Sequence, residues 1–237
     1  MSLDILKSIK QKDEPDSRIS YREIMTFYYP LALTSLLGLG VHPFVTFFIG
    51  QSRMSIESLA VLPVINSLVF IFRSTGLSFQ EVGIALVGDK GEGFIPLRNF
   101  ARKLSLISAG LLIIISFSPL AKIWFHDVSG LSLELTEFAL LPLIIISIMP
   151  ALSVLVSFQR SILVAFKNTS PITPATAIEV LGILMVLYFL ISGFDIVGAI
   201  AAMTAFIIGR IGAILYLSPP YLRISKNIIN NNTNYIK

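Results

Sequence analysis

Two long apolar runs near the beginning of the chain decide the fold. Tyr29–Gln51 reads YPLALTSLLGLGVHPFVTFFIGQ, and Glu57–Gly88 reads ESLAVLPVINSLVFIFRSTGLSFQEVGIALVG. About 20 apolar residues are enough for an α-helix to cross the hydrocarbon core of a bilayer. Each run therefore predicts one membrane-spanning helix, and the short polar break at Ser52–Ser55 predicts a tight turn between the two helices.

The second run carries four polar side chains at membrane depth. Asn66, Arg73 and Gln80 are spaced seven apart, so they share one face of a helix, and Glu81 flanks that face. Charged side chains at this depth are costly and usually face a protein interior or a water-filled cavity. The row therefore has two interpretations: it lines a wet transport pathway, or it forms an internal hydrogen-bonded network that locks this helix to its neighbours.

The composition excludes an ordinary soluble domain. Of the 237 residues 54% are hydrophobic and only 14% are charged, and the mean hydropathy is +0.82. Soluble domains have about a quarter of their residues charged. The apolar runs are continuous, whereas a transmembrane barrel would show shorter, alternating segments. The sequence therefore predicts an all-α polytopic membrane protein, in which one bundle fills the chain.

The apolar runs predict six transmembrane helices, and these lie at Ile24–Gln51, Ile56–Val87, Leu104–Ala121, Phe138–Phe158, Pro174–Ile191 and Ile196–Leu217. They form one bundle over residues 24–217, preceded by a cytoplasmic lead-in, residues 1–23. A polar tail, residues 218–237, follows and is expected to be disordered, because it is rich in Asn and begins near Pro219–Pro220. Glycines, a proline and mixed charges predict that Asp89–Lys103 is a loop with a short interfacial amphipathic segment before the third helix.

The positive charges are distributed unequally between the two ends of the predicted bundle. Of the 18 Lys and Arg residues, fourteen lie on the side of the chain termini, and only Arg53 and Lys122 lie on the other side. Arg73 and Arg210 lie inside spans. The positive-inside rule then predicts that both termini are cytoplasmic, in a protein of the plasma (inner) membrane. Since the positive charges flank apolar spans, we do not expect a nucleic acid as partner.

Three further ionisable residues inside the spans are candidates for function. His42 is either a neutral histidine bonded to a nearby backbone carbonyl or a proton-coupling group. Glu179 and Arg210 either pair with Arg73 or Glu81, or extend toward the membrane surface from the cytoplasmic ends of their spans. The sequence has no HExxH, GxSxG or Walker motif, so we do not expect an enzyme. No cysteine is present and the acidic residues lack metal-site spacing, so no metal or other cofactor is expected.

Short segments along the chain form a familiar pattern: FYYPLAL at 27–33, FFIGQ at 47–51, SIESLAVLPVINSLVF at 55–70, QEVGIALVG at 80–88, a PxxP-type turn at 171–174 and FDIVGAIAA at 194–202. Together they resemble one six-helix half of the MATE-like multidrug/oligosaccharidyl-lipid/polysaccharide exporter superfamily. The PLAL start, the QE late in the second helix and LLPLIIISIMP at 140–150 are most similar to the C-terminal half of the progressive ankylosis protein family. The resemblance extends over about residues 20–217.

The resemblance implies a fold of two six-helix bundles, related by a pseudo-two-fold axis along the membrane normal, with a substrate cavity between them. It also implies alternating-access export of a small organic or anionic solute, driven by a gradient of H⁺ or Na⁺. Glu81 matches the family by its position, as the acidic residue late in the second helix. A lone half cannot close a central cavity, so a second six-helix half or a second copy of this chain is expected as partner. The other hypothesis is a non-transporting membrane scaffold or subunit, whose polar row serves assembly.

Overall fold

The computed structural model describes the backbone of residues 21–234, and the side chains of Tyr21, Leu36 and residues 38–230. The predicted lead-in, residues 1–23, lies almost entirely outside this part of the chain. The described residues are helical, apart from turns and one isolated β-bridge between Arg53 and Val197. The prediction of an all-α fold is therefore confirmed.

The helices follow one another along the chain with short connections. Their bounds are α2 Tyr21–Gly50, α3 Ser55–Leu86, α4 Phe94–Phe117, α5 Leu120–Lys122, the π-helix η1 Ile123–Val128, α6 Leu133–Ile146, α7 Met149–Ala165, α8 Ile172–Tyr188, the π-helix η2 Phe189–Gly193 and α9 Gly198–Asn234.

Within the described part of the chain, five stretches of helix are long and apolar enough to cross a membrane, and these are Ser55–Leu86, Phe94–Phe117, Leu133–Ala165, Ile172–Gly193 and Gly198–Asn230. In α2 the apolar stretch within the described side chains is shorter, Gly38–Gly50. The structure thus supports a polytopic membrane protein with five spans, and the sixth span stays a prediction.

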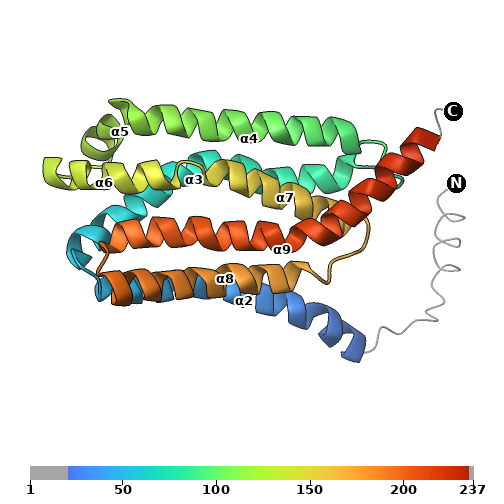
Figure 1. Cartoon of the computed structure of the whole chain (residues 1–237), viewed down its shortest axis with the longest axis horizontal. Helices are drawn as coiled ribbons and strands as arrows, with labels where there is room; N and C mark the ends of the chain where they lie inside the picture. Colours follow the sequence, from blue (N-terminus) through green and yellow to red (C-terminus); the bar gives the residue numbers. More distant parts are fainter. Residues whose placement is uncertain (1–20, 235–237) are drawn as a thin grey trace, which may run out of the picture.

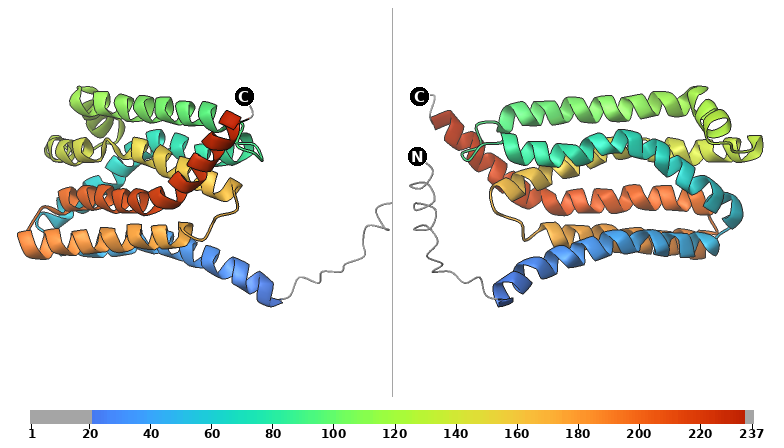
Figure 2. Two further views of the ribbon diagram at one scale, coloured as in Figure 1. Left: turned by 45° about the vertical axis from the view of Figure 1, so that its right-hand side comes forward. Right: turned by 180° about the vertical axis from the view of Figure 1, so that it is seen from behind.

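The long helices lie side by side along one common axis, with α9 in the middle of the bundle (Figure 1). The α2–α3 turn, the η1 segment and the η2–α9 connection lie at one end, on the left in Figure 1. The α3–α4 loop, the α7–α8 loop and the last part of α9 lie at the other end, and both views in Figure 2 agree. The chain therefore alternates between the two ends as the predicted topology requires.

The helix α4 begins ten residues before Leu104, where the third span was predicted to start. The loop ends at Gly93, and the predicted amphipathic segment is the first part of α4, in which Phe94, Leu97 and Ala101 form a buried face. The Phe94 ring stacks on Phe158 of α7, with ring centroids 5.9 Å apart. These apolar contacts outweigh the local signals of a loop, since packing of an amphipathic face supplies most helix stability in proteins.

The predicted fourth span is longer than expected and is broken into α6 and α7. Its helices extend from Leu133 to Ala165 rather than from Phe138 to Phe158, and the break lies after Ile146. Pro150 has no N–H to donate to the carbonyl of Ile146, so the regular helical ladder cannot continue there. Ser147 instead donates its hydroxyl to the carbonyl of Ile144, at 2.7 Å.

The last helix does not end at Leu217, and the prediction of a disordered tail is wrong for residues up to Asn234. The C-terminal part of α9, red in Figure 1, turns away from the rest of the helix, which contains Pro219 and Pro220. Tyr221 packs edge-to-face on Phe158, with ring centroids 5.8 Å apart. Ile228 is 3% exposed, and an apolar face thus holds this segment on the bundle.

Glycines allow the helices around the bundle centre to approach closely. A Cβ atom on Gly76 of α3 would lie 2.9 Å from the backbone nitrogen of Val154 in α7. A Cβ atom on Gly209 of α9 would lie 2.7 Å from the carbonyl oxygen of Glu179 in α8. Small residues permit such contacts between membrane helices. The second contact brings the backbones next to Glu179 and Arg210 together.

Candidate functional site

A cavity of about 400 Å³ lies among α2, α3, α7, α8 and α9, beside the break between α6 and α7. Five of the seven predicted candidate residues line it: His42, Asn66, Arg73, Glu179 and Arg210. Arg160 and Thr176 also line it, together with apolar side chains. The structure therefore gathers charged groups from four helices, Arg73 on α3, Arg160 on α7, Glu179 on α8 and Arg210 on α9, around one space.

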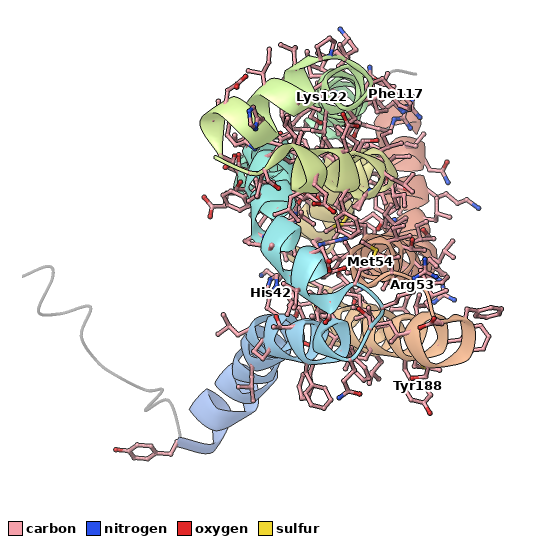
Figure 3. All side chains as sticks on the ribbon, turned by 90° about the vertical axis from the view of Figure 1, so that its left-hand side faces the viewer. His42, Arg53, Met54, Phe117, Lys122 and Tyr188 are labelled. Carbon is pink, nitrogen blue, oxygen red and sulfur yellow. The ribbon has the colours of Figure 1, made fainter. Side chains whose placement is uncertain are left out.

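The cavity opens on the face that α2 and α3 form. Its exposed lining residues belong to these two helices, and they include His42 of α2 and Phe70 and Leu77 of α3. Seen from behind in Figure 2, α2 and α3 lie in front and diverge from their common turn, with α9 visible between them. Figure 3 shows His42 on this side of the molecule, near the separation between α2 and α3.

Glu179 and Arg210 form a buried ion pair between α8 and α9. Arg210 Nη2 lies 3.0 Å from Glu179 Oε1, and the side chains are 8% and 12% exposed. One of the two predicted alternatives gave them Arg73 or Glu81 as partners, and the structure pairs them with each other instead. Since both side chains are enclosed by the bundle, extension toward the membrane surface does not account for them.

Arg160 is the site residue that sequence reasoning missed. We counted it among the positive charges outside the span, because the fourth span was expected to end at Phe158. In the structure α7 continues to Ala165, and Arg160 Nη2 donates a hydrogen bond to Thr176 Oγ1 at 3.1 Å. The sequence does hold a signal, since serines recur every fourth residue beside Arg160, at Ser153, Ser157 and Ser161. All three are buried in the structure. Such a stripe indicates a helix face in contact with other helices.

Arg73 lies on the cavity wall with its guanidinium in the protein interior. Its Nε atom is buried and has no hydrogen-bond partner among the described residues. Asn66 lies two turns earlier on the same face, half-buried, as the seven-residue spacing predicts. These two residues of the row therefore line the cavity, and its water content stays a prediction.

The other two members of the predicted row do not line this cavity. Gln80 is half-buried, and Glu81 is exposed. Seven residues fall short of two full turns by about 20°, so the row drifts around the helix with each heptad. Gly76 and Gly83 lie on another face of α3, and this face packs on α7, against Val154 and Ser161.

His42 is exposed at the edge of the cavity, and its ring lies 6.3 Å from the ring of Phe206. Among the described residues, no group of three His, Cys, Asp or Glu side chains comes together as a metal ion would need. The cavity lining therefore offers charged and hydrogen-bonding side chains to a solute.

Comparisons of the chain with protein-family models, with curated proteins and with solved structures give no match.

Proposed function

We propose that this chain is one half of a membrane transporter of the MATE-like type, which exports a small organic or anionic solute by alternating access. The observation that carries the proposal is the charged cavity within a bundle of apolar helices. Ionisable residues inside a membrane protein usually mark a solute or ion pathway. A volume of about 400 Å³ is also in the range of pockets that bind small organic ligands.

The broken helix beside the cavity supports the same function. Ile146 ends α6, Met149 begins α7, and both line the cavity. Non-helical backbone at membrane depth is tolerated where it lines a cavity or is buried in protein. In secondary transporters such discontinuous helices commonly form the substrate site near the middle of the bilayer.

The open face of the cavity supports the need for a partner. Next to His42 of α2, the cavity lining exposes two large apolar side chains of α3, Phe70 and Leu77. A second six-helix half, or a second copy of this chain, would cover this face and close the cavity. We place the assembly in the plasma (inner) membrane with both termini cytoplasmic, and we propose H⁺ or Na⁺ as the coupling ion.

A second candidate function is a non-transporting scaffold or subunit. The polar contacts between helices favour it: the Glu179–Arg210 pair joins α8 to α9, and the Arg160–Thr176 bond joins α7 to α8. Under this hypothesis the charged groups lock the bundle and no solute crosses it. Interhelical hydrogen bonds in membranes average below about 1 kcal/mol, so such contacts alone repay little of the cost of buried charges.

Solute flux in vesicles separates the two functions. The full chain is inserted into liposomes alone and together with a matching six-helix half, and uptake of labelled organic anions, cations and neutral solutes is measured. We expect flux above that of empty liposomes when the cavity face is covered, by the second half or by a second copy. Folded protein that moves none of these solutes in either preparation would contradict transport and favour the scaffold.

A further inference from the structure

The positive charges in the cavity exceed the negative ones. Arg73, Arg160, Arg210 and Glu179 line it, so three positive charges face one negative charge and the formal sum is +2 with His42 neutral. The one carboxylate pairs with Arg210. Among the described residues, neither Arg73 nor Arg160 forms a salt bridge. Two guanidinium groups, on α3 and on α7, therefore line the cavity without a carboxylate at bonding distance.

The cavity lining offers more hydrogen-bond donors than acceptors. The Nε atoms of Arg73, Arg160 and Arg210 are buried and have no hydrogen-bond partner among the described residues. The hydroxyl of Thr176 already accepts from Arg160 and donates to the carbonyl of Ile172, at 3.2 Å. A guanidinium carries five N–H donors and no acceptor. Since buried donors are nearly always satisfied in proteins, the wall is suited to a ligand that brings several acceptors.

A phosphate or carboxylate group meets these requirements best. The planar fork of arginine matches such groups with two parallel hydrogen bonds, and these charge-assisted bonds are among the strongest in proteins. Apolar side chains, including Val69, Met149 and Phe206, form much of the remaining wall. The ligand would therefore join an anionic group to an apolar body that fits within about 400 Å³.

We infer that Arg73 and Arg160 draw a small organic ligand with a phosphate or carboxylate group into this cavity, and that Glu179 withholds Arg210 from this group. Arg210 is engaged by Glu179 at 3.0 Å, whereas Thr176 fixes Arg160 at the wall without neutralising its charge. Glu179 also attracts Arg73 and Arg160 electrostatically. Its carboxylate is thus an internal anion that competes with the ligand, and it limits the affinity so that the ligand can leave again.

The ligand can reach this site from two sources. The cavity opens between α2 and α3, beside the exposed apolar side chains of Phe70 and Leu77. A lipid with an anionic head group could enter sideways from the bilayer, and a water-soluble organic anion could enter from one end. Both share the same anionic group, and the inference rests on the proposed function of the cavity as a solute site.

Titration calorimetry on the purified full-length protein in detergent tests the inference, with phenyl phosphate as the probe and phenol as its neutral analogue. We expect saturable binding of phenyl phosphate and none of phenol. Arg73→Gln and Arg160→Gln should each weaken binding about tenfold or more, because each removes a charge-assisted donor. Glu179→Gln should strengthen binding, since it frees Arg210. Arg102→Gln is the matched control, because Arg102 is exposed and lies outside the cavity.

Two further measurements keep the test independent of folding defects. Arg160→Lys retains the charge but not the fork, and it should bind more weakly than the wild type and more tightly than Arg160→Gln. In nanodiscs, competition by phosphatidic acid would assign the site to a lipid phosphate, and unchanged binding would assign it to a soluble anion, with support for the inference in both cases. Equal binding of phenol and phenyl phosphate by the wild type, or equal losses in Arg102→Gln and Arg160→Gln, would overturn it.

The flux experiment in vesicles and the binding experiment test separate claims, and each can fail without the other. Anion binding that depends on Arg73 and Arg160, in a protein that moves no solute, would contradict transport and leave the site standing. Flux without any preference for anions, and without binding of phenyl phosphate, would contradict the anion site and leave transport standing.

Discussion

Thr176 holds the guanidinium of Arg160 in position. This guanidinium has few other hydrogen-bond partners inside the cavity. Its hydroxyl accepts from Arg160 Nη2 at 3.1 Å while its own proton goes to the carbonyl of Ile172 one turn earlier. Arg160 is held in this way on the cavity wall rather than against the Glu179 carboxylate, which pairs with Arg210. One hydroxyl therefore determines how the positive charge of the site is distributed.

We expect Thr176→Val to destabilise the folded protein and to weaken anion binding. Valine keeps the shape of threonine but cannot accept a hydrogen bond, so Arg160 loses its partner at a cost of about 1–3 kcal/mol. Thermal unfolding in detergent measures the first effect and calorimetry with phenyl phosphate measures the second. The matched control is Thr75→Val, because Thr75 is exposed and bonds only the carbonyl of Phe72 in its own helix. Equal behaviour of the two variants would show that Thr176 does not position Arg160.

Most of the site could be predicted from single residues. A polar residue inside an apolar run is conspicuous, and this signal identified Asn66, Arg73, Glu179 and Arg210. Arg160 was missed because it stands near the end of a run, where a charged residue usually marks the membrane surface. The pairing of Glu179 with Arg210 depends on how closely α8 and α9 approach, and a linear pattern does not contain that distance.

At the scale of elements, the contact between α3 and α7 fixes the position of the helix that carries Arg73. Gly76 lies against the backbone of Val154, and Gly83 lies against the side chain of Ser161. The two glycines are seven residues apart, as are Asn66 and Arg73. One face of α3 therefore packs on α7 while another faces the cavity.

Gly76→Ala should lower the stability of the protein. The added methyl group would lie 2.9 Å from the backbone nitrogen of Val154, and a backbone atom cannot move aside as a side chain can. The expected cost is about 1–3 kcal/mol, as for other overpacked sites, and thermal unfolding in detergent measures it. At Gly110 of α4 no atom lies within 4 Å of an added Cβ, so Gly110→Ala should not lower the melting temperature. An unchanged melting temperature in Gly76→Ala would contradict the close packing of α3 on α7.

The apolar runs predicted where helices exist better than where they end. The first two helices agree with their predicted bounds within a few residues, since polar residues and glycines flank them closely. The start of α4 and the end of α9 were wrong, because short amphipathic faces at Phe94–Ala101 and Tyr221–Ile228 continue these helices beyond their apolar runs. Their burial depends on neighbours distant in the sequence, among them Phe158.

At the scale of the whole molecule, the two ends of the bundle differ in charge. Figure 3 views the end that carries Arg53 and Lys122, and Lys122 there forms a salt bridge with Glu137. The opposite end carries more positive residues: Lys90 in the α3–α4 loop, Arg98, Arg102 and Lys103 in the first turns of α4, and Lys167 in the α7–α8 loop. Positive residues accumulate on the cytoplasmic side of membrane proteins, so this asymmetry predicts an orientation of the bundle.

We therefore expect the end with Arg53 to face outward and the end with Lys167 to face the cytoplasm. The chain contains no cysteine, so single cysteines at these positions report their side of the membrane directly. In intact cells a membrane-impermeant thiol reagent should label Arg53→Cys, and it should label Lys167→Cys only after the cells are opened. Labelling of Lys167→Cys from outside would contradict the topology.

We propose above all that the cavity is a water-filled solute pathway inside the membrane. A single cysteine at Asn66, which lines the cavity, tests it most directly when the protein is assembled with its covering partner in liposomes. Ile114→Cys is the matched control, because Ile114 lies on α4 outside the cavity and is 63% exposed on the surface of the bundle. We predict that a water-soluble thiol reagent labels Asn66→Cys and blocks solute flux, and that Ile114→Cys keeps its flux. Folded protein in which Asn66→Cys is not labelled, or is labelled while flux continues unchanged, would contradict the account.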